Sequence, residues 1–137
     1  MRGVLVDSNV LLDVLTEDST WYEWSSSALA ECASESTLYL NPIIYAEVSI
    51  GFDRIEDLEA ALPDDLFRRL PLPLEAAFLA GKAFLRYRRR GGARTSTLPD
   101  FFIGAHAAVA GLRLLTRDEG RYRAYFPKVS FTSPEES

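Results

Sequence analysis

Short apolar segments alternate with helical segments along this 137-residue chain, and this alternation constrains the fold more than any other feature. The strands are predicted from short apolar runs in which Leu and Val are frequent, a composition typical of strands covered on both faces. Their predicted ranges are residues 3–6, 38–40, 67–72, 112–116 and 129–131. Strands that alternate with helices predict an α/β fold, with a mainly parallel sheet of about five strands sandwiched by helices.

The helices between these strands are predicted from apolar spacing and from signals at their ends. Thr20 and Glu23 have the spacing of a capping box. Asn41 followed by Pro42 supplies an N-cap and a proline suited to the first helical turn. One further helix is predicted from Leu74, Phe78 and Leu85, which share a helical face. The predicted helical ranges are 10–15, 20–34, 42–52, 55–62, 74–90 and 99–111.

The length predicts one domain, over residues 1–131, followed by a disordered tail at 132–137. Cys32 is the only cysteine, so a disulfide within the chain is excluded. The sequence has no signal-peptide pattern and no apolar run of about 18 residues, so we expect a soluble cytoplasmic protein without membrane contact. The net charge of −5 argues mildly against broad nucleic-acid binding, although local charge matters more than the sum.

Four carboxylates are predicted to meet at one edge of the sheet. Asp7 ends the first strand, and Asp118 follows the strand at 112–116. Glu47 lies in the helix after the second strand, and Asp100 lies in the first turn of the helix opened by Pro99. Because sites in open parallel sheets form at the carboxyl ends of the strands, we expect these acids to converge there.

Glu47 indicates what such a site would bind. Its helical neighbours include Ile43, Ile44 and Ile50, so it is predicted to face the core, where a lone charge is costly. No Lys or Arg lies between Glu47 and Arg54 to neutralise it. Clustered carboxylates repel one another, and Mg²⁺ or Mn²⁺ relieves that repulsion because hard cations prefer oxygen ligands.

Three of the four acids also have a structural explanation by themselves. Asp7 could be a helix N-cap, Asp100 an acid favoured by the helix dipole, and Asp118 a turn residue. Only their convergence favours a metal site. The remaining acids near these motifs are expected to be solvated or locally paired: Asp13, Glu17, Asp18 and Glu119.

Four segments together resemble the PIN-domain ribonucleases, and within them the VapC toxins of bacterial toxin–antitoxin pairs. These segments are LVDSNVLLD (5–13), YAEV (45–48), LPDFFIGAHA (98–107) and LLTRDEGRY (114–122). The resemblance implies an endoribonuclease that depends on one or two Mg²⁺ or Mn²⁺ ions and leaves 5′-phosphate and 3′-hydroxyl ends. It also implies a VapB-like antitoxin partner, an RNA substrate and a homodimer. It assigns catalytic and metal-binding roles to Asp7, Glu47, Asp100 and Asp118, and carboxylate-orienting roles to Asn9 and Thr116.

A basic run ends the helix predicted at 74–90. It comprises Arg88, Arg89 and Arg90, with Arg94 just beyond. Cations are favoured at a helix C-terminus, so this run can be a solvated end. It can equally be an RNA-phosphate patch that leads to Asp100, which Arg121, Arg123 and Lys128 would extend.

The remaining chemistry-bearing residues are interpreted as structural. His106 is the only histidine, so catalysis by a histidine pair is excluded, and we expect it to be packed or on the surface. Cys32 is predicted to be a packing residue and Ser8 a backbone-turn residue. An aromatic group comprises Trp21, Tyr22 and Trp24, which either pack in the core or form a surface for a partner.

Three functions stay open at this point. The first is a toxin nuclease inhibited by an antitoxin. The second is a PIN-domain nuclease that processes cellular RNA without an antitoxin. The third is a metal-free α/β binding or regulatory module.

Overall fold

The computed structural model describes residues 3–91 and 97–134, and the chain forms five strands and seven helices within these ranges. The strands are β1 (Val4–Val6), β2 (Leu38–Leu40), β3 (Phe67–Arg69), β4 (Arg113–Leu115) and β5 (Phe131–Thr132). The helices are α1 (Ser8–Leu15), α2 (Tyr22–Glu35), α3 (Pro42–Ser49), α4 (Ile55–Ala61), α5 (Leu74–Arg89), α6 (Leu98–Ala110) and α7 (Gly120–Arg123).

The five strands form one parallel sheet in the order β3-β2-β1-β4-β5, which confirms the predicted α/β fold class. β1 is the central strand, and Val4 pairs with Leu38 of β2 on one side and with Arg113 of β4 on the other. The first strand of the chain therefore has neighbours on both sides, and the residue after it emerges at the middle of the sheet edge.

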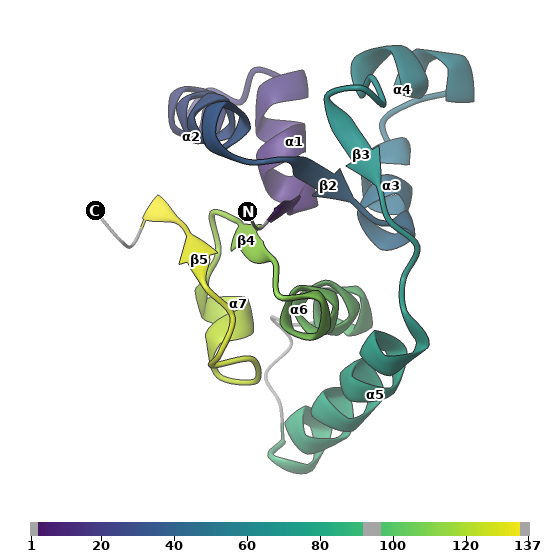
Figure 1. Cartoon of the computed structure of the whole chain (residues 1–137), viewed down its shortest axis with the longest axis vertical. Helices are drawn as coiled ribbons and strands as arrows, with labels where there is room; N and C mark the ends of the chain where they lie inside the picture. The colour runs from purple at the N-terminus through teal and green to yellow at the C-terminus, as the bar shows by residue number, and fades with distance from the viewer. Residues whose placement is uncertain (1–2, 92–96, 135–137) are drawn as a thin grey trace.

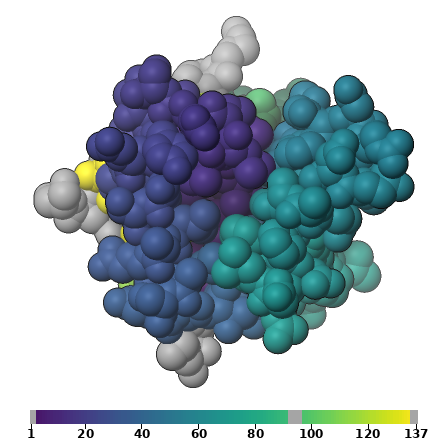
Figure 2. Space-filling view, turned by 90° about the horizontal axis from the view of Figure 1, so that it is seen from above, coloured from purple at the N-terminus to yellow at the C-terminus, as the bar shows by residue number. Residues whose placement is uncertain are grey.

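Helices cover both faces of this sheet. α1 and α2 lie over one face and α5 and α6 over the other, while α7 lies beside α6 (Figure 1). α3 contacts both α1 and α6, so it links the two layers. Figure 2 shows α1 and α2 on one side of the molecule and the segment from α3 to β3 on the other. The described residues contain no helix that is long and apolar enough to cross a membrane.

The core explains why the strands can be so short. Val4, Leu5 and Val6 of β1 are all buried, as a strand covered on both faces requires. Burying a side chain of this size stabilises the fold by about 1.5–3 kcal/mol relative to leaving it exposed. Three residues therefore suffice to hold β1 in place and to deliver the following residue to the sheet edge.

The predicted capping box at the start of α2 is wrong. α2 begins at Tyr22, and Thr20 lies before it. The carboxylate of Asp18 caps this turn instead, because its Oδ2 accepts hydrogen bonds from the backbone N–H groups of Thr20 and Trp21 at 3.0 and 2.8 Å. A carboxylate that accepts two N–H groups leaves no role here for the threonine hydroxyl.

α5 covers nearly its predicted range, but the apolar face that predicted it points to solvent. Leu74 is 85% exposed and Phe78 is 69% exposed. The buried face consists of Ala76, Ala80 and Ala83 instead. α5 packs on α6 through these small side chains, which allow the two helices to approach closely.

The predicted disordered tail begins too early. Thr132 belongs to β5 and pairs with Leu115 of β4. Ser133 is buried, and its hydroxyl donates a 2.6 Å hydrogen bond to Glu119. The domain therefore extends past residue 131, because this last strand completes the sheet edge. Residues 135–137 of the predicted tail lie outside the described residues.

Candidate active site

All four predicted acids lie at the carboxyl edge of the sheet. Asp7 follows β1 and is the N-cap of α1, while Asp118 lies past the end of β4. Glu47 lies in α3, which follows β2, and Asp100 lies in the first turn of α6. Their charges interact, since both Asp100 and Glu47 raise the pKa of Asp7, and Asp118 raises the pKa of Asp100.

Asp7 is the most enclosed of these acids, with 4% of its surface exposed. Its Oδ1 accepts the N–H of Ser8 at 2.8 Å. Its Oδ2 accepts the hydroxyls of Thr116 and Tyr122 at 2.8 and 2.7 Å. Burial nevertheless raises the pKa of Asp7 from 3.8 to about 6, against the opposing effect of these hydroxyls. The ionised carboxylate is therefore held in place but poorly neutralised.

Thr116 connects three parts of the site. Its hydroxyl donates to Asp7 and accepts the backbone N–H of Asp118 at 3.1 Å. The side-chain amide of Asn9 donates to the same hydroxyl at 3.4 Å. Of the two predicted carboxylate-orienting residues, Thr116 therefore contacts Asp7 directly, whereas Asn9 reaches Asp7 through Thr116.

Glu47 is half-buried and lies opposite the start of α1. The hydroxyl of Ser8 donates a 2.7 Å hydrogen bond to its Oε1. Burial raises the pKa of Glu47, and the charge of Asp100 raises it further, while Ser8 and Arg121 oppose the shift. The apolar stripe invoked for Glu47 is only partly buried, since Ile50 is 86% exposed. The interpretation of Ser8 as a turn residue was too narrow, because its side chain also binds the site.

Arg121 lies between Asp100 and Asp118. Its Nε is 2.7 Å from Asp118 Oδ2, and its Nη1 is 3.7 Å from Asp100 Oδ2. Asp100 also caps α6, where Thr97 N–H donates to its Oδ2 at 3.1 Å. Burial and the charge of Asp118 raise the pKa of Asp100, although Thr97 and Arg121 oppose this. Sequence reasoning assigned Arg121 only to an outer basic patch, because Asp118 lies in the loop before α7 and their pairing depends on the turn between them.

The donor set fits a hard divalent cation. It consists of carboxylate oxygens, and three of these acids have raised pKa values, which indicates more negative charge than the surrounding donors neutralise. Over residues 3–91 and 97–134, however, no three His, Cys, Asp or Glu side chains stand close enough to hold one ion as they are placed. The hydrogen bonds and ion pairs described above account for this separation, because each carboxylate is drawn to a protein donor.

Two of the acids have the structural roles that the sequence allowed for them and also lie in the acid cluster. Asp7 is an N-cap and Asp100 takes part in a capping box with Thr97, so both acids stabilise helix ends while they lie at the shared edge. A capping carboxylate still has lone pairs on the side away from the backbone. Capping therefore fixes where these two acids point and leaves them able to bind a ligand.

Two acids outside the cluster, Asp13 and Glu119, are buried and paired with arginines. Asp13 was expected to be solvated or locally paired, but it is buried and forms an ion pair with Arg117, 104 residues away, with Nε 2.7 Å from Oδ2. The expectation for Asp13 is wrong because the chain after β4 returns over α1. Glu119 is locally paired with Arg123 on α7, and it is also buried.

A series of aromatic rings connects the basic run to the helix that carries Asp100. Arg88 and Arg89 are in the last turn of α5, and Arg90 is its C-cap. The guanidinium of Arg90 lies 5.7 Å from the centre of the Tyr125 ring, which in turn lies 5.5 Å from the ring of Phe101, next to Asp100. Arg94 lies outside the described residues.

His106 and Cys32, which were interpreted as structural residues, are both buried. His106 is buried in α6, and its Nδ1 lies 3.0 Å from the side-chain nitrogen of Asn41, the N-cap of α3. Burial lowers the pKa of His106, so the ring is neutral near pH 7. Cys32 is buried in the core.

The aromatic group is divided between two environments. Trp24 packs against the core, while the guanidinium of Arg117 lies 5.3 Å from the centre of the Trp21 ring.

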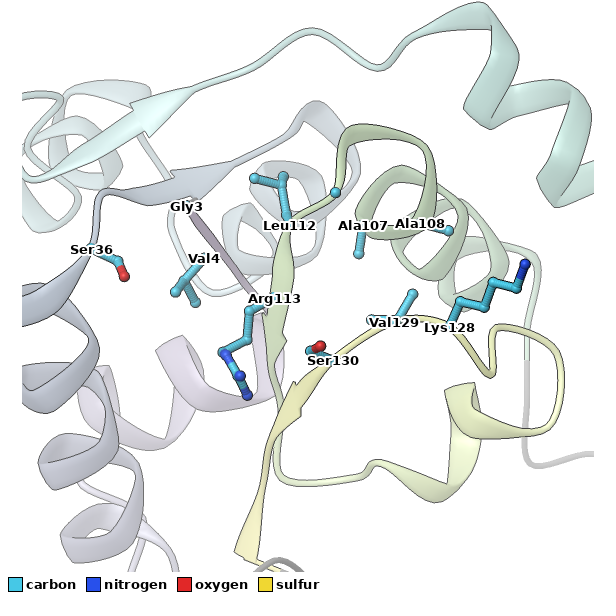
Figure 3. Close-up of a pocket in the computed structure, with 11 residues that line it drawn as sticks. Gly3, Val4, Ser36, Ala107, Ala108, Leu112, Arg113, Lys128, Val129 and Ser130 are labelled. Carbon is cyan, nitrogen blue, oxygen red and sulfur yellow. The ribbon is translucent and has the colours of Figure 1, made fainter. Parts of the chain in front are cut away.

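A pocket of about 320 Å³ lies at the opposite edge of the sheet, by the amino ends of β1 and β4 (Figure 3). Its described lining includes Arg113 and Lys128 and no acidic residue. Figure 3 shows these two cationic side chains pointing in different directions. Arg113 is also bound to the carbonyl of Phe131 at 2.6 Å. The carboxylates that could bind a metal therefore lie at the acidic edge and not in this pocket.

Two residues of the acidic edge were missed by sequence reasoning. Ser8 stands beside Asp7 in the sequence, so its position could have suggested it. Tyr122 is 1% exposed and donates its hydroxyl to Asp7 from 115 residues away. Nothing local in the sequence marks that contact, because it depends on how α7 packs against β1 and α6.

Known proteins of this architecture can now be compared with the chain. FitAcB from Neisseria gonorrhoeae is 22% identical with a TM-score of 0.73, over 98% of this chain and 99% of that chain. VapBC2 from Rickettsia felis, bound to a DNA fragment from their promoter, is 15% identical with a TM-score of 0.72, over 95% of this chain and 97% of that chain. A toxin–antitoxin complex from Klebsiella pneumoniae is 22% identical with a TM-score of 0.68, over 93% of this chain and 95% of that chain. At these identities the likeness concerns the fold. A search of curated proteins finds no significant match. The PIN domain family model matches residues 4–127, which include all four acids, and the chain therefore belongs to the PIN-domain family.

Proposed function

We propose that this chain is a metal-dependent endoribonuclease that acts as the toxin of a toxin–antitoxin pair. The observation that carries the proposal is the cluster of carboxylates at the carboxyl edge of a PIN-domain sheet, where three acids have raised pKa values. Acids in that state are poised to bind a divalent cation, which would compensate their excess charge.

Asp7, Glu47, Asp100 and Asp118 would hold the metal. A bound Mg²⁺ or Mn²⁺ would supply charge stabilisation for the scissile phosphate and favour ionisation of the attacking water. Thr116 and Tyr122 fix one oxygen of Asp7, and the capping bond from Thr97 fixes Asp100. These contacts keep the site in one geometry, which reduces the reorganisation needed during reaction.

Glu47 or Asp118 would act as the general base. The raised pKa of Glu47 suits that role, because a base works best when its pKa lies near the working pH. The side chain of Asp118 is 39% exposed, so water reaches it readily. In-line attack by that water would leave a 5′-phosphate and a 3′-hydroxyl on the RNA.

The RNA would approach along the basic residues at the end of α5. Arg88, Arg89 and Arg90 are all exposed at the end of a helix packed against α6, which carries Asp100. Exposed arginines bind phosphates without reading the base, and this accounts for affinity in a chain whose net charge is negative.

The toxin assignment rests on the kind of structure that the fold resembles. The neighbours include a toxin–antitoxin complex and a VapBC2 complex. A VapB-like antitoxin would cover the acidic edge of this chain and insert a basic side chain near the carboxylates. A homodimer is part of the same proposal, and exposed apolar side chains such as Phe78 are suited to a protein interface.

The cleavage proposal is tested with Asp7→Asn and Asp100→Asn, each purified and incubated with RNA and Mg²⁺ or Mn²⁺. We expect both substitutions, and EDTA, to abolish cleavage. Asp64→Asn removes an exposed acid from the loop before β3 and should cleave normally. Undiminished cleavage by either site variant would refute the mechanism. Growth arrest on expression, relieved by the product of a short gene directly upstream, separates a toxin from a nuclease without an antitoxin.

One observation favours a second candidate, a metal-free binding or regulatory module. Arg121 already neutralises part of the charge of Asp100 and Asp118. Calorimetric titration that detects no Mn²⁺ binding, together with no cleavage of any RNA tested, would favour that module.

A further inference from the structure

Arg121 forms ion pairs with two of the four site acids, Asp100 and Asp118. Its guanidinium is bound to Asp118 and lies within ion-pair distance of Asp100, the two contacts being 2.7 and 3.7 Å. It also lowers the pKa of Glu47, so its charge reaches three of the four acids. These acids come from α3, α6 and the loop after β4, so the positive charge of Arg121 acts on all three elements.

This position conflicts with the position of a divalent cation. An ion bound by Asp100 and Asp118 needs oxygens that Arg121 now engages, and like charges at such distances repel. As the side chains are placed, no three acids of the described chain can surround one ion. The arginine and the metal therefore cannot both use these two carboxylates fully.

The arginine can leave at little cost. Its side chain is 44% exposed and is carried by α7, a helix of four residues at the surface. The ion pair with Asp118 is partly exposed on both sides, and such pairs contribute little to stability. A divalent cation carries twice the charge of the guanidinium, so it attracts the two carboxylates more strongly.

We propose that Arg121 is the counter-ion of the metal-free site, that it competes with the divalent cation for Asp100 and Asp118, and that metal binding releases it toward the phosphates of the RNA. This inference rests on the proposed function, since it requires a metal at these acids. In this proposal Arg121 has two successive anionic partners, first the pair of carboxylates and then a phosphate of the RNA. Metal binding thereby moves a cation from the acids to the substrate side of the site.

The test measures Mn²⁺ affinity by calorimetry in three proteins. Arg121→Gln should bind Mn²⁺ about three- to tenfold more tightly than the unchanged chain, because a competing charge is gone. Arg121→Lys keeps the charge and should stay close to the unchanged chain. The matched control is Arg54→Gln, which removes an exposed arginine that is also paired with an acid. Its partner is Glu56 and not one of the four site acids.

A spectroscopic readout follows the arginine itself. The Nε–Hε signal of Arg121, identified by its loss in Arg121→Lys, should show slow hydrogen exchange in the metal-free protein. Saturating Mg²⁺ should accelerate that exchange by at least several-fold, because the bond to Asp118 is broken. An exchange rate that Mg²⁺ leaves unchanged would overturn the proposed release.

The outcomes separate this inference from the proposed function. If the unchanged chain binds Mn²⁺ through Asp100, shown by loss of binding in Asp100→Asn, but Arg121→Gln binds with the same affinity, competition is overturned and the nuclease proposal stands. If Mn²⁺ binds only to Arg121→Gln, competition is supported in its strongest form. If neither protein binds Mn²⁺, both the competition and the metal-dependent function fail.

Discussion

The hydroxyl of Tyr122 donates a 2.7 Å hydrogen bond to Oδ2 of Asp7, although 115 residues separate the two along the chain. Among the described residues Tyr122 is the largest fully buried side chain. A Cβ on Gly104 of α6 would collide with Phe126 and press closely on Tyr122, so glycine permits this packing. The close packing of α7 on α6 therefore places a phenol against the central acid of the site.

Removal of this hydroxyl tests how much Asp7 depends on it. Tyr122→Phe keeps the ring but withdraws a donor from a buried carboxylate, which raises the pKa of Asp7 further. We expect the free energy of unfolding to fall by about 2 kcal/mol at pH 7.5 and by less at pH 5, where Asp7 is largely protonated. Urea unfolding in EDTA measures both values. Tyr125→Phe is the control, and an equal loss at the two pH values would contradict the assigned hydrogen bond.

Asp7 itself makes the metal-free protein less stable at neutral pH. Its pKa is about 6 in the folded chain and 3.8 as a reference, so the folded state binds the proton more tightly. The stabilisation is complete below pH 3.8 and is lost as the pH rises through about 6, a difference of about 3 kcal/mol. In EDTA at pH 7.5, Asp7→Asn should therefore unfold at higher urea concentration than the unchanged chain. That advantage should shrink toward pH 4, and its persistence there would disprove the raised pKa.

The buried ion pair between Asp13 and Arg117 should respond unequally to removal of its two members. Arg117→Ala leaves a carboxylate that is 3% exposed with Ser25 as its remaining donor, and we expect a loss of about 3 kcal/mol. Asp13→Asn should cost less, because Arg117 is 31% exposed and can turn to water. Urea unfolding of both variants and of the double variant gives the coupling. Equal losses would show that the carboxylate is not the enclosed partner.

The basic run should contribute to the salt dependence of RNA binding. Replacing Arg88, Arg89 and Arg90 by Gln removes three exposed cations, and each phosphate contact in single-stranded RNA contributes about 0.7 to the slope of log K against log salt. We expect the slope to decrease by up to about 2, measured by fluorescence anisotropy in an Asp100→Asn background that cannot cleave. The control replaces Arg54, Arg68 and Arg69 by Gln. A slope that changes equally in both proteins would count against a localised patch.

Much of the fold could be predicted because its signals are local. Apolar runs bounded by turn residues predicted all five strands, and Asn41-Pro42 predicted the start of α3. The alternation of elements then dictated a parallel sheet and the edge at which Asp7, Glu47 and Asp118 emerge. At the start of α2 the prediction was wrong because Asp18, and not Thr20, accepts the free backbone N–H groups.

The sequence by itself determined which acids a parallel sheet brings to its carboxyl edge, because the positions of strands and helices along the chain follow from local patterns. Only the tertiary structure decided what each acid touches: Tyr122 and Thr116 at Asp7, Ser8 at Glu47, and Arg121 between Asp100 and Asp118. These contacts join segments up to 115 residues apart, and their geometry depends on helix packing to within an ångström. Local periodicity carries no information at that scale, so the charge balance of the site had to come from the folded chain.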